Sequence, residues 1–360
     1  MIALFESYPL LAERLPHVSL GNFPTPVQKL DRLSATIGAS VLYAKRDDLS
    51  AVPYGGNKVR KLEFLLGRAL QRGAEHVLTV GAAGSNHALA TAVYARKTGL
   101  RTTALLYHQP NTRLVSRNLL YGHRCGAHIE MAADDRAAAA TRRRGLYRIP
   151  MGGSSILGTI GFVSAGLELA SQVRRAEIPP PRRIYVALGT MGTAAGLLLG
   201  LRAAKLDATV VAVRVVPSRI ANPRAFACLY RNTGRLLRRL DDSFPDCPLA
   251  GIEFRDELFG EGYASFTPEG MRAVAMAREH AGLSLEGTYT GKAFAALLAD
   301  MHEPAVRDQP ILFWNTYNSH PFPADLNEQD YRELPTGLHR YFEEPTQPLD
   351  ELTAAVLSGD

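Results

Sequence analysis

The sequence is poor in cysteine, lacks any long apolar run and carries little excess charge. Its three cysteines, Cys125, Cys228 and Cys247, are far apart and odd in number. They therefore predict neither a disulfide framework nor a metal-binding CxxC pair. This use of cysteine fits a reducing cytoplasm, where we expect the protein to work. No apolar stretch approaches the roughly 18 residues of a membrane-spanning helix, so we expect no membrane partner.

The charge balance argues against two further classes of protein. Lys and Arg number 41 and Asp and Glu number 35, which leaves a net charge of +6 over 360 residues. The one clear basic run, at residues 142–144, is more typical of a solvated helix end than of a nucleic-acid site, so we expect no nucleic-acid partner. Residues 1–16 lack a basic leader before an apolar core, and we expect no secretory signal there.

Short apolar segments alternate with segments of helical spacing along most of the chain. We expect strands at residues 41–44, 76–80, 102–107, 128–130, 183–188, 209–215 and 311–314, and helices at residues 58–70, 85–98, 114–121, 160–173, 192–203 and 268–281. Strands that alternate with helices predict an α/β fold with open, mostly parallel sheets. From about residue 343 the chain contains proline and acidic residues, and we expect a loose tail.

A glycine-rich turn leads to a lysine at residues 54–58 (YGGNK), directly before a predicted helix. Lys58 is followed by Arg60 and Lys61 on that helix. A lysine beside other cations in a partly dry cleft has a lowered pKa and can form a Schiff base. The alternative is an ordinary surface lysine after a turn.

Two other loops place small residues at helix starts. Residues 81–87 (GAAGSNH) bring a hydroxyl and an amide, from Ser85 and Asn86, to such a position, where plain helix capping is the alternative. Residues 189–193 (GTMGT) follow a predicted strand, and their N–H groups at a helix start favour an anion. This loop lacks both GxGxxG and the Walker lysine, so it predicts a cradle for one phosphate, with a plain tight turn as the alternative.

Three further segments bring hydroxyl groups to strand ends or turns. They are residues 260–263 (GEGY) with Tyr263, residues 289–293 (YTGKA) with Tyr289, and residues 315–319 (NTYNS) after a predicted strand. A hydroxyl at the end of a parallel strand points into the crevice where α/β proteins bind ligands. Core or surface tyrosines are the alternative. The histidines form no paired metal pattern, and we expect no catalytic metal.

Taken together, residues 45–48 (KRDD), 55–58 (GGNK) and 60–64 (RKLEF) resemble the pyridoxal-phosphate (PLP) enzymes of the tryptophan-synthase-β-like fold, fold type II. More narrowly, they resemble the D-cysteine desulfhydrase and 1-aminocyclopropane-1-carboxylate (ACC) deaminase family. The motifs at 84–87, 152–154, 189–193 and 289–293 fall in the family's order, and the resemblance covers about residues 15–320.

The resemblance implies two domains with the cofactor in the cleft between them. A large PLP-binding domain would comprise residues 1–55 and 164–345, and a small inserted α/β domain would comprise residues 56–163. Residues 346–360 would form the loose tail. The resemblance also implies two open twisted sheets flanked by helices, and a homodimer.

The resemblance implies a role for each matching residue. Lys58 would hold PLP through a Schiff base and move the α-proton, Asn86 would bond the phenolic oxygen of PLP, and Thr316 would face its pyridine nitrogen. Ser85 would lie beside the substrate and, with Tyr263 and Tyr289, take part in catalysis. The other cofactor contacts would come from Asn57, Gly189, Thr190, Met191, Gly192 and Thr193, and substrate contacts from Ser85, Asn86, His87, Tyr263, Tyr289 and Tyr317.

The residue after Tyr289 separates two reactions within this family. Ring-opening ACC deaminases resemble one another in carrying Glu there, whereas this chain has Thr290. Thr290 therefore favours α,β-elimination, with D-cysteine converted to pyruvate, sulfide and ammonia. The alternatives are ACC deamination to 2-oxobutyrate and ammonia, or a PLP-binding member with another β-substituted substrate or no turnover. A nucleotide-binding Rossmann protein is also open, although the missing GxGxxG opposes it.

The sequence departs from the family's pattern at the expected site. Residues 315–318 (NTYN) replace His-Thr-Gly-Gly, Met191 replaces a glycine, and residues 286–288 (EGT) replace Asp-Pro-Val. Tyr317 and Asn318 add bulk where glycines leave space, so we expect a pocket of different shape unless Tyr317 turns away. The resemblance thus predicts the cofactor more strongly than the substrate.

Overall fold

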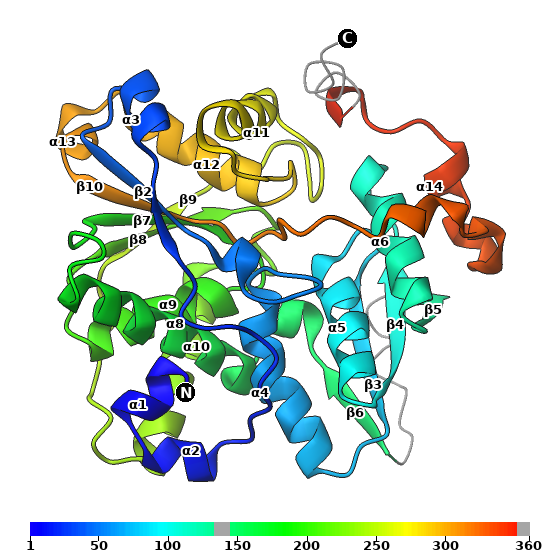
Figure 1. Cartoon of the computed structure of the whole chain (residues 1–360), viewed down its shortest axis with the longest axis horizontal. Coiled ribbons are helices and arrows are strands. Elements are labelled where there is room, and N and C mark those ends of the chain that lie inside the picture. Colours follow the sequence, from blue (N-terminus) through cyan, green and yellow to red (C-terminus); the bar gives the residue numbers. More distant parts are fainter. Residues whose placement is uncertain (133–144, 351–360) are drawn as a thin grey trace.

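The computed structural model describes residues 1–132 and 145–350, which form two α/β units, each built on its own sheet (Figure 1). The basic run at residues 142–144 lies outside the described residues. The larger unit contains the N-terminus and most of the second half of the chain, and the smaller unit lies beside it (Figure 1).

The larger sheet has the strand order β1-β2-β10-β7-β8-β9. Its strands are β1 (Val27–Lys29), β2 (Val41–Lys45), β7 (Arg183–Leu188), β8 (Thr209–Arg214), β9 (Ile252–Arg255) and β10 (Pro310–Trp314). β1 pairs antiparallel with β2, and the other neighbours are parallel. The central strands are nearly continuous apolar runs because helices cover both of their faces.

Helices cover the two faces of the larger sheet (Figure 1). On one face lie α1 (Ala3–Ser7), α2 (Leu10–Arg14), α8 (Ile156–Arg174), α9 (Gly192–Ala203) and α10 (Pro223–Leu240); on the other lie α3 (Asp31–Ile37), α11 (Pro268–Ala281), α12 (Thr290–Asp300) and α13 (Pro304–Arg307). Within β8, Val210 faces the first group and Val211 the second, as the two-residue period of a strand requires. α8 is long and apolar enough to cross a membrane, but most of it is buried in this core.

The smaller sheet is all parallel, with the strand order β5-β4-β3-β6. Its strands are β3 (His76–Ala82), β4 (Arg101–Tyr107), β5 (His128–Met131) and β6 (Leu146–Ile149), and α4 (Lys58–Gln71), α5 (Asn86–Lys97) and α6 (Arg113–Arg124) pack together on one of its faces. Val77 and Leu106 join that core, while Leu78 and Leu105 point to the other face. The α/β fold expected from the sequence is confirmed.

After β10 the chain crosses from the larger unit to the smaller one. It forms the short turns η3 (Ala324–Glu328), η4 (Tyr331–Glu333) and η5 (Thr336–Leu338) and the helix α14 (Arg340–Glu343). Leu326, Leu334, Leu338 and Tyr341 are buried in the core of the smaller unit. The division at residues 55 and 163 stays a prediction, but this returning segment packs with the smaller unit. Residues 346–350, expected to be loose, are hydrogen-bonded to both units, whereas residues 351–360 lie outside the described chain.

Candidate active site

A cavity of about 230 Å³ lies where both sheets present the carboxyl ends of their strands. The loops after β3, β7 and β10 all reach it. Its lining contains most of the residues that the sequence singled out: Asn57, Lys58, Ser85, Asn86, His87, Gly189, Thr190, Met191, Thr193, Tyr263, Tyr289, Thr316 and Tyr317. Gly192 lies within the same loop at the start of α9. The cavity thus gathers segments separated by more than 200 residues in sequence.

Lys58 is the first residue of α4 and is held by close contact between two loops. Gly56 has φ +96°, and a Cβ placed there would lie 2.9 Å from the Thr316 carbonyl oxygen. The Asn57 N–H donates to that same oxygen at 3.1 Å. The Asn57 side chain donates to Thr193 Oγ1 at 2.9 Å. The turn therefore needs glycine, and its hydrogen bonds join the start of α4 to the loop after β10 and to the first turn of α9.

Burial lowers the pKa of Lys58 to about 8, although the nearby Glu286 carboxylate raises it. Burial also lowers the pKa of Lys61 well below its ordinary value, and the charge of Lys58 adds to this shift. Lys61 lies one helical turn after Lys58 and therefore on the same face of α4. In the described part of the chain, no carboxylate forms an ion pair with Lys61. Burial thus penalises positive charge on both amines, a cost that an anion bound beside them would reduce.

The Asn86 side chain is oriented by two donors on its oxygen. Tyr54 donates its hydroxyl to Asn86 Oδ1 at 3.2 Å, and Asn118 of α6 donates to the same oxygen at 3.0 Å. Because Oδ1 is occupied, the amide nitrogen of Asn86 is left to serve the cavity. Ser85 caps α5, since its Oγ accepts from the Ala88 N–H at 3.1 Å, and it also lines the cavity. Ser85 therefore serves as the helix cap and also faces the cavity, so both interpretations of this loop hold.

The glycine loop after β7 packs against a second glycine turn. Thr190 Oγ1 lies 2.6 Å from Ser154 Oγ, which also accepts from Lys61 Nζ at 3.1 Å and from the Gly192 N–H at 3.2 Å. Met191 has φ +69°, a left-handed conformation that glycine adopts without cost. This loop is therefore a cluster of hydroxyl, amine and N–H donors at the start of α9.

Two tyrosines meet across the cavity, with their hydroxyl oxygens 2.5 Å apart. Burial raises the pKa of both Tyr263 and Tyr289, so both hydroxyls stay protonated at neutral pH. Glu286 also lines the cavity, and its carboxylate accepts from the N–H groups of Thr288, Tyr289 and Thr290, just before and at the start of α12, at 2.8–2.9 Å. Burial raises the pKa of Glu286, although these hydrogen bonds lower it.

The departure at residues 315–318 reaches the cavity directly. Tyr317 lines it, and burial raises the pKa of its hydroxyl. Asn318 is buried instead as a structural group, accepting from the Gly55 N–H at 2.7 Å and donating to the His320 carbonyl at 2.8 Å. The pocket therefore carries the extra bulk expected of Tyr317, whereas Asn318 stabilises the turn before Lys58.

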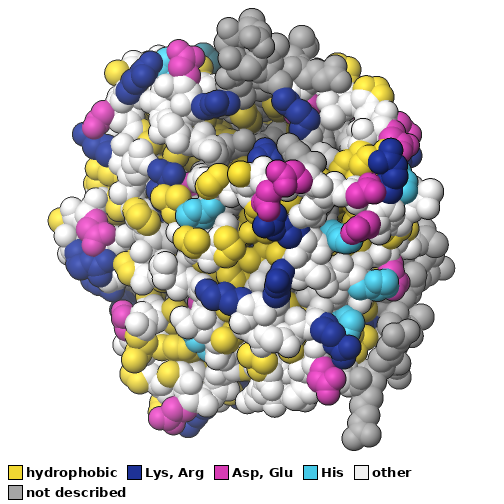
Figure 2. Space-filling model, turned by 45° about the vertical axis from the view of Figure 1, so that its right-hand side comes forward, with side chains coloured by type: hydrophobic (Ala, Val, Ile, Leu, Met, Phe, Trp, Pro, Cys, Tyr) yellow, Lys and Arg dark blue, Asp and Glu magenta, His cyan; other side chains and the backbone are white. Residues whose placement is uncertain are grey.

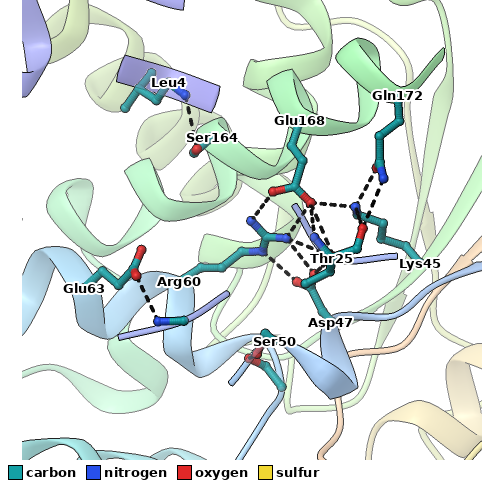
Figure 3. A network of polar contacts seen from close by, with 12 residues as sticks. Leu4, Thr25, Lys45, Asp47, Ser50, Arg60, Glu63, Ser164, Glu168 and Gln172 are labelled. Carbon is teal, nitrogen blue, oxygen red and sulfur yellow. Dashed lines mark hydrogen bonds and ion pairs between the residues drawn. The ribbon is translucent and has the colours of Figure 1, made fainter. Parts of the chain in front are cut away.

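A buried network of charges anchors α4 to the larger unit (Figure 3). Arg60 donates to both oxygens of Asp47, in the turn η1 (Asp47–Leu49), and to both oxygens of Glu168 on α8, at 2.8–2.9 Å. Lys45 of β2 donates to Glu168 at 2.5 Å and to Gln172 at 2.6 Å. Burial lowers the pKa of Lys45. The charges of the two cations and the two carboxylates therefore compensate one another. Arg60, the centre of this network, is two residues after Lys58.

Sequence reasoning missed several residues of this site. Lys61, Tyr107 and Glu286 line the cavity, and Tyr54 and Asn118 orient Asn86. The helical spacing from Lys58 could have identified Lys61. Glu286 lies in the segment 286–288 that departs from the family's pattern, and this departure was a signal for its place in the site. The partnership of Asn118 with Asn86 had no such signal, because it depends on how α5 packs against α6.

The residues present fit pyridoxal phosphate. A Cβ at Gly192 would lie 2.7 Å from Ser154 Oγ and 3.2 Å from Lys61 Nζ, so only glycine leaves this donor cluster open. The cluster suits a single phosphate, Lys58 supplies a buried amine, and Asn86 supplies an amide donor. Fold and cavity together bring the buried Lys58 amine and a cluster of donors at a helix start into one α/β cleft, an arrangement that suits a bound phosphate-bearing cofactor.

Comparisons with known proteins place the chain in a family. Residues 18–316 match the family described as pyridoxal-phosphate dependent enzyme. D-cysteine desulfhydrases of Salmonella choleraesuis and Serratia proteamaculans are 37% and 34% identical over 319 and 318 residues, covering 84% of this chain and 94% of each relative. The chain therefore belongs to the family of pyridoxal-phosphate-dependent enzymes, as its motifs indicated.

Two solved structures resemble the fold. One, described as an ACC deaminase homologue, is 32% identical with a TM-score of 0.74 and covers 89% of this chain and 97% of its own. The other, an L-serine ammonia-lyase from the fungus Rhizomucor miehei, is 18% identical with a TM-score of 0.60 and covers 88% and 98%. The second likeness concerns the fold alone.

Proposed function

We propose that the chain is a PLP-dependent lyase that removes the β-substituent of a small amino acid, with D-cysteine as the substrate. Pyruvate, sulfide and ammonia would be the products. The observation that carries this proposal is the Lys58 amine opening into the same cavity as the cluster around Lys61 and Ser154. The D-cysteine desulfhydrases among its relatives support the choice of substrate.

When bound, PLP supplies an electron sink for the carbanion left at the substrate's α-carbon. Lys58 Nζ would hold the cofactor and then, as a free amine, take the α-proton. Its pKa of about 8 leaves part of the amine neutral near physiological pH, as a base requires. Asn86 Nδ2 would donate to the cofactor's phenolic oxygen, because its partner atom Oδ1 is already occupied.

Other residues would orient the reactants. Lys61, Thr190, Thr193 and the N–H groups at the start of α9 would bind the phosphate. Tyr263 and Tyr289 stay protonated because their pKa values are raised, so while one hydroxyl donates to the other, the second would donate to the substrate. Thr316 would face the pyridine nitrogen as a neutral partner. These roles are proposals for the residues that the sequence singled out.

The test is keto-acid release by the purified protein loaded with PLP. The panel is D-cysteine, L-cysteine, β-chloro-D-alanine, D-serine and ACC. We expect pyruvate and sulfide from D-cysteine, and loss of at least about a hundredfold in Lys58→Ala. Lys97→Ala, which removes an exposed lysine of α5, is the matched control and keeps full activity. Full elimination activity in Lys58→Ala would refute the proposal.

ACC deamination is the second candidate function. A solved structure described as an ACC deaminase homologue resembles this chain. In addition, Glu286 brings a carboxylate into the cavity, 3.3 Å from the Thr290 hydroxyl. Thr290 is the residue that stands where the ring-opening enzymes carry Glu, so a carboxylate lies next to that position. Release of 2-oxobutyrate from ACC faster than turnover of D-cysteine would favour this function. A yellow protein that turns over none of the panel would favour another substrate or a member without turnover.

We also propose that the enzyme is a cytoplasmic homodimer without nucleic-acid or membrane partners. The dimer rests on the family resemblance, and the compartment on three free, dispersed cysteines. On the face drawn in Figure 2, basic and acidic side chains are interspersed rather than gathered by sign. Light scattering should give twice the mass of one chain, and a single-chain mass would refute the dimer.

A further inference from the structure

Two loops border the active-site cavity, and the end of the described chain holds both. Residues 108–112 connect β4 to α6 in the smaller unit, and Tyr107, directly before them, lines the cavity. Residues 260–267 precede α11 in the larger unit and carry Tyr263. In Figure 1 the red C-terminal segment returns from α14 towards the space between α6 and α11.

On the side of the smaller unit, this segment replaces a missing helix cap. The Gln347 N–H donates to the Asn111 carbonyl at 3.0 Å, and Asn111 Nδ2 donates to the Glu344 carbonyl at 2.9 Å. The Arg113 N–H donates to Asp350 Oδ2 at 2.7 Å. Thr112, the N-cap residue of α6, makes no side-chain capping bond, so the buried Asp350 carboxylate supplies the negative charge that a helix start favours.

On the side of the larger unit, the Gln347 side chain binds two backbone groups. Its Oε1 accepts from the Phe266 N–H at 2.7 Å, and its Nε2 donates to the Ala264 carbonyl at 3.0 Å. Leu349 packs against the apolar core that α11 and α12 share. Ala264 has φ +62°, a left-handed conformation that costs energy in a residue other than glycine. The loop therefore adopts this shape where external bonds hold it.

We propose that residues 344–350 form a clasp across the two units and that Gln347 is a positioning residue for Tyr263. Tyr263, whose hydroxyl lies 2.5 Å from that of Tyr289, is one residue before Ala264 and three before Phe266, whose backbone groups Gln347 binds. Without the two hydrogen bonds from Gln347, the loop at residues 260–267 loses contacts that hold Tyr263 in its position at the cavity. The catalytic part of this proposal rests on the proposed function, in which Tyr263 contacts the substrate.

The clasp also joins the two sides of the cavity mechanically. Asn111 and Arg113 belong to the smaller unit, and Ala264 and Phe266 to the larger. Any motion that separates the units here must stretch or break the bonds of Gln347. The clasp thus couples the position of Tyr263 to the arrangement of the two units in this structure.

The test compares Gln347→Ala with the wild-type holoenzyme of full length. Hydrogen–deuterium exchange without substrate should show residues 262–267 exchanging at least about tenfold faster in the variant. The value of kcat/KM for D-cysteine should fall about fivefold or more, which corresponds to the loss of well-placed hydrogen bonds. Glu344→Ala is the control, because the Glu344 carboxylate binds Arg340 within α14 and touches neither loop; exchange and kinetics should match the wild type.

A double-mutant cycle separates positioning from a merely structural role. If Gln347 acts through Tyr263, then Gln347→Ala should have little further effect on kcat/KM in a Tyr263→Phe background. The same loss in both backgrounds, or unchanged exchange at residues 262–267, would overturn the proposal. If the wild type turns over no amino acid of the panel, the proposed function fails, and the exchange comparison alone then decides the clasp.

Discussion

The chemistry of the two lysines in the cavity depends on their burial. Lys58 and Lys61 lie on one face of α4, and burial lowers the pKa of each. Neither amine gains a carboxylate close enough for an ion pair in the described chain. A phosphate beside Lys61 would reduce the cost of its buried charge by neutralising it. A carbonyl compound that reacts with Lys58 would do the same by converting the amine to a Schiff base.

We expect the cofactor-free protein to capture PLP faster as pH rises through about 8. Lys58 attacks a carbonyl only as the neutral amine, and its lowered pKa places that form above pH 8. The initial rate should increase about tenfold between pH 7 and pH 9, the increase expected from the neutral fraction of a single amine. Recovery of visible absorbance after mixing measures this rate, and a flat profile over this range would contradict the assignment of the pKa.

Met191 offers a second residue-scale prediction, because its φ of +69° strains any residue with a Cβ. Met191→Val should lower the free energy of unfolding by about 1 kcal/mol or more, since a β-branched residue is a genuine outlier there. Met191→Gly should keep it within about 1 kcal/mol, since relief of strain offsets lost packing. Urea unfolding measures both, with Met191→Leu as the control for shape. Equal stability of the Val and Leu variants would show that the conformation is not strained.

At the scale of elements, buried ion pairs attach the helix α4 to the larger unit. Arg60 binds Asp47 and Glu168 through buried ion pairs, and Lys45 shares Glu168. These contacts fix the beginning of α4, and so they fix the backbone from which Lys58 extends. Further along, α4 packs in the core of the smaller unit. One helix therefore carries the reactive amine at the junction of both units.

Glu168→Gln should destabilise the protein by about 3–5 kcal/mol, because it leaves Arg60 and Lys45 buried with too little negative charge. The matched control is Glu177→Gln, which removes the surface ion pair with Arg175 and should cost about 1 kcal/mol at most. Urea unfolding compares the two. A similar decrease in the free energy of unfolding in both variants would show that the buried network contributes no more stability than a surface ion pair.

For the whole molecule, the same network predicts sensitivity to acid. Burial raises the pKa of Glu168, but Arg60 and Lys45 outweigh this and lower the pKa to about 2, below the ordinary 4.5. A carboxylate with a lowered pKa contributes stability that is present above the unfolded-state value and is lost as pH falls through the folded one. The melting temperature should therefore drop between about pH 4.5 and pH 2, and by less in Glu168→Gln. If the melting temperatures of the wild type and of Glu168→Gln fall equally over this pH range, the lowered pKa of Glu168 is contradicted.

The whole fold was predictable in its class and in many of its elements. Helices 192–203 and 268–281 have the predicted bounds, because their apolar spacing or caps are local signals. The strands β1, β6 and β9 were not expected, since three or four residues are too few for a reliable alternation. They exist as strands because a neighbouring strand supplies their hydrogen bonds. α10 and α12 were also missed, although both contain enough residues to show a helical period.

The sequence by itself determined the α/β class, the lysine and glycine motifs and their family, since local spacing and residue type carry that information. Only the tertiary structure decided which side chains meet. Asn118 with Asn86, Lys61 with Ser154, and Gln347 with Phe266 are separated by 32, 93 and 81 residues. Hydrogen bonds are directional and short, so each pairing exists only when packing of distant elements brings the two atoms into reach. Motifs can thus predict a cofactor, whereas the shape of its pocket depends on the whole fold.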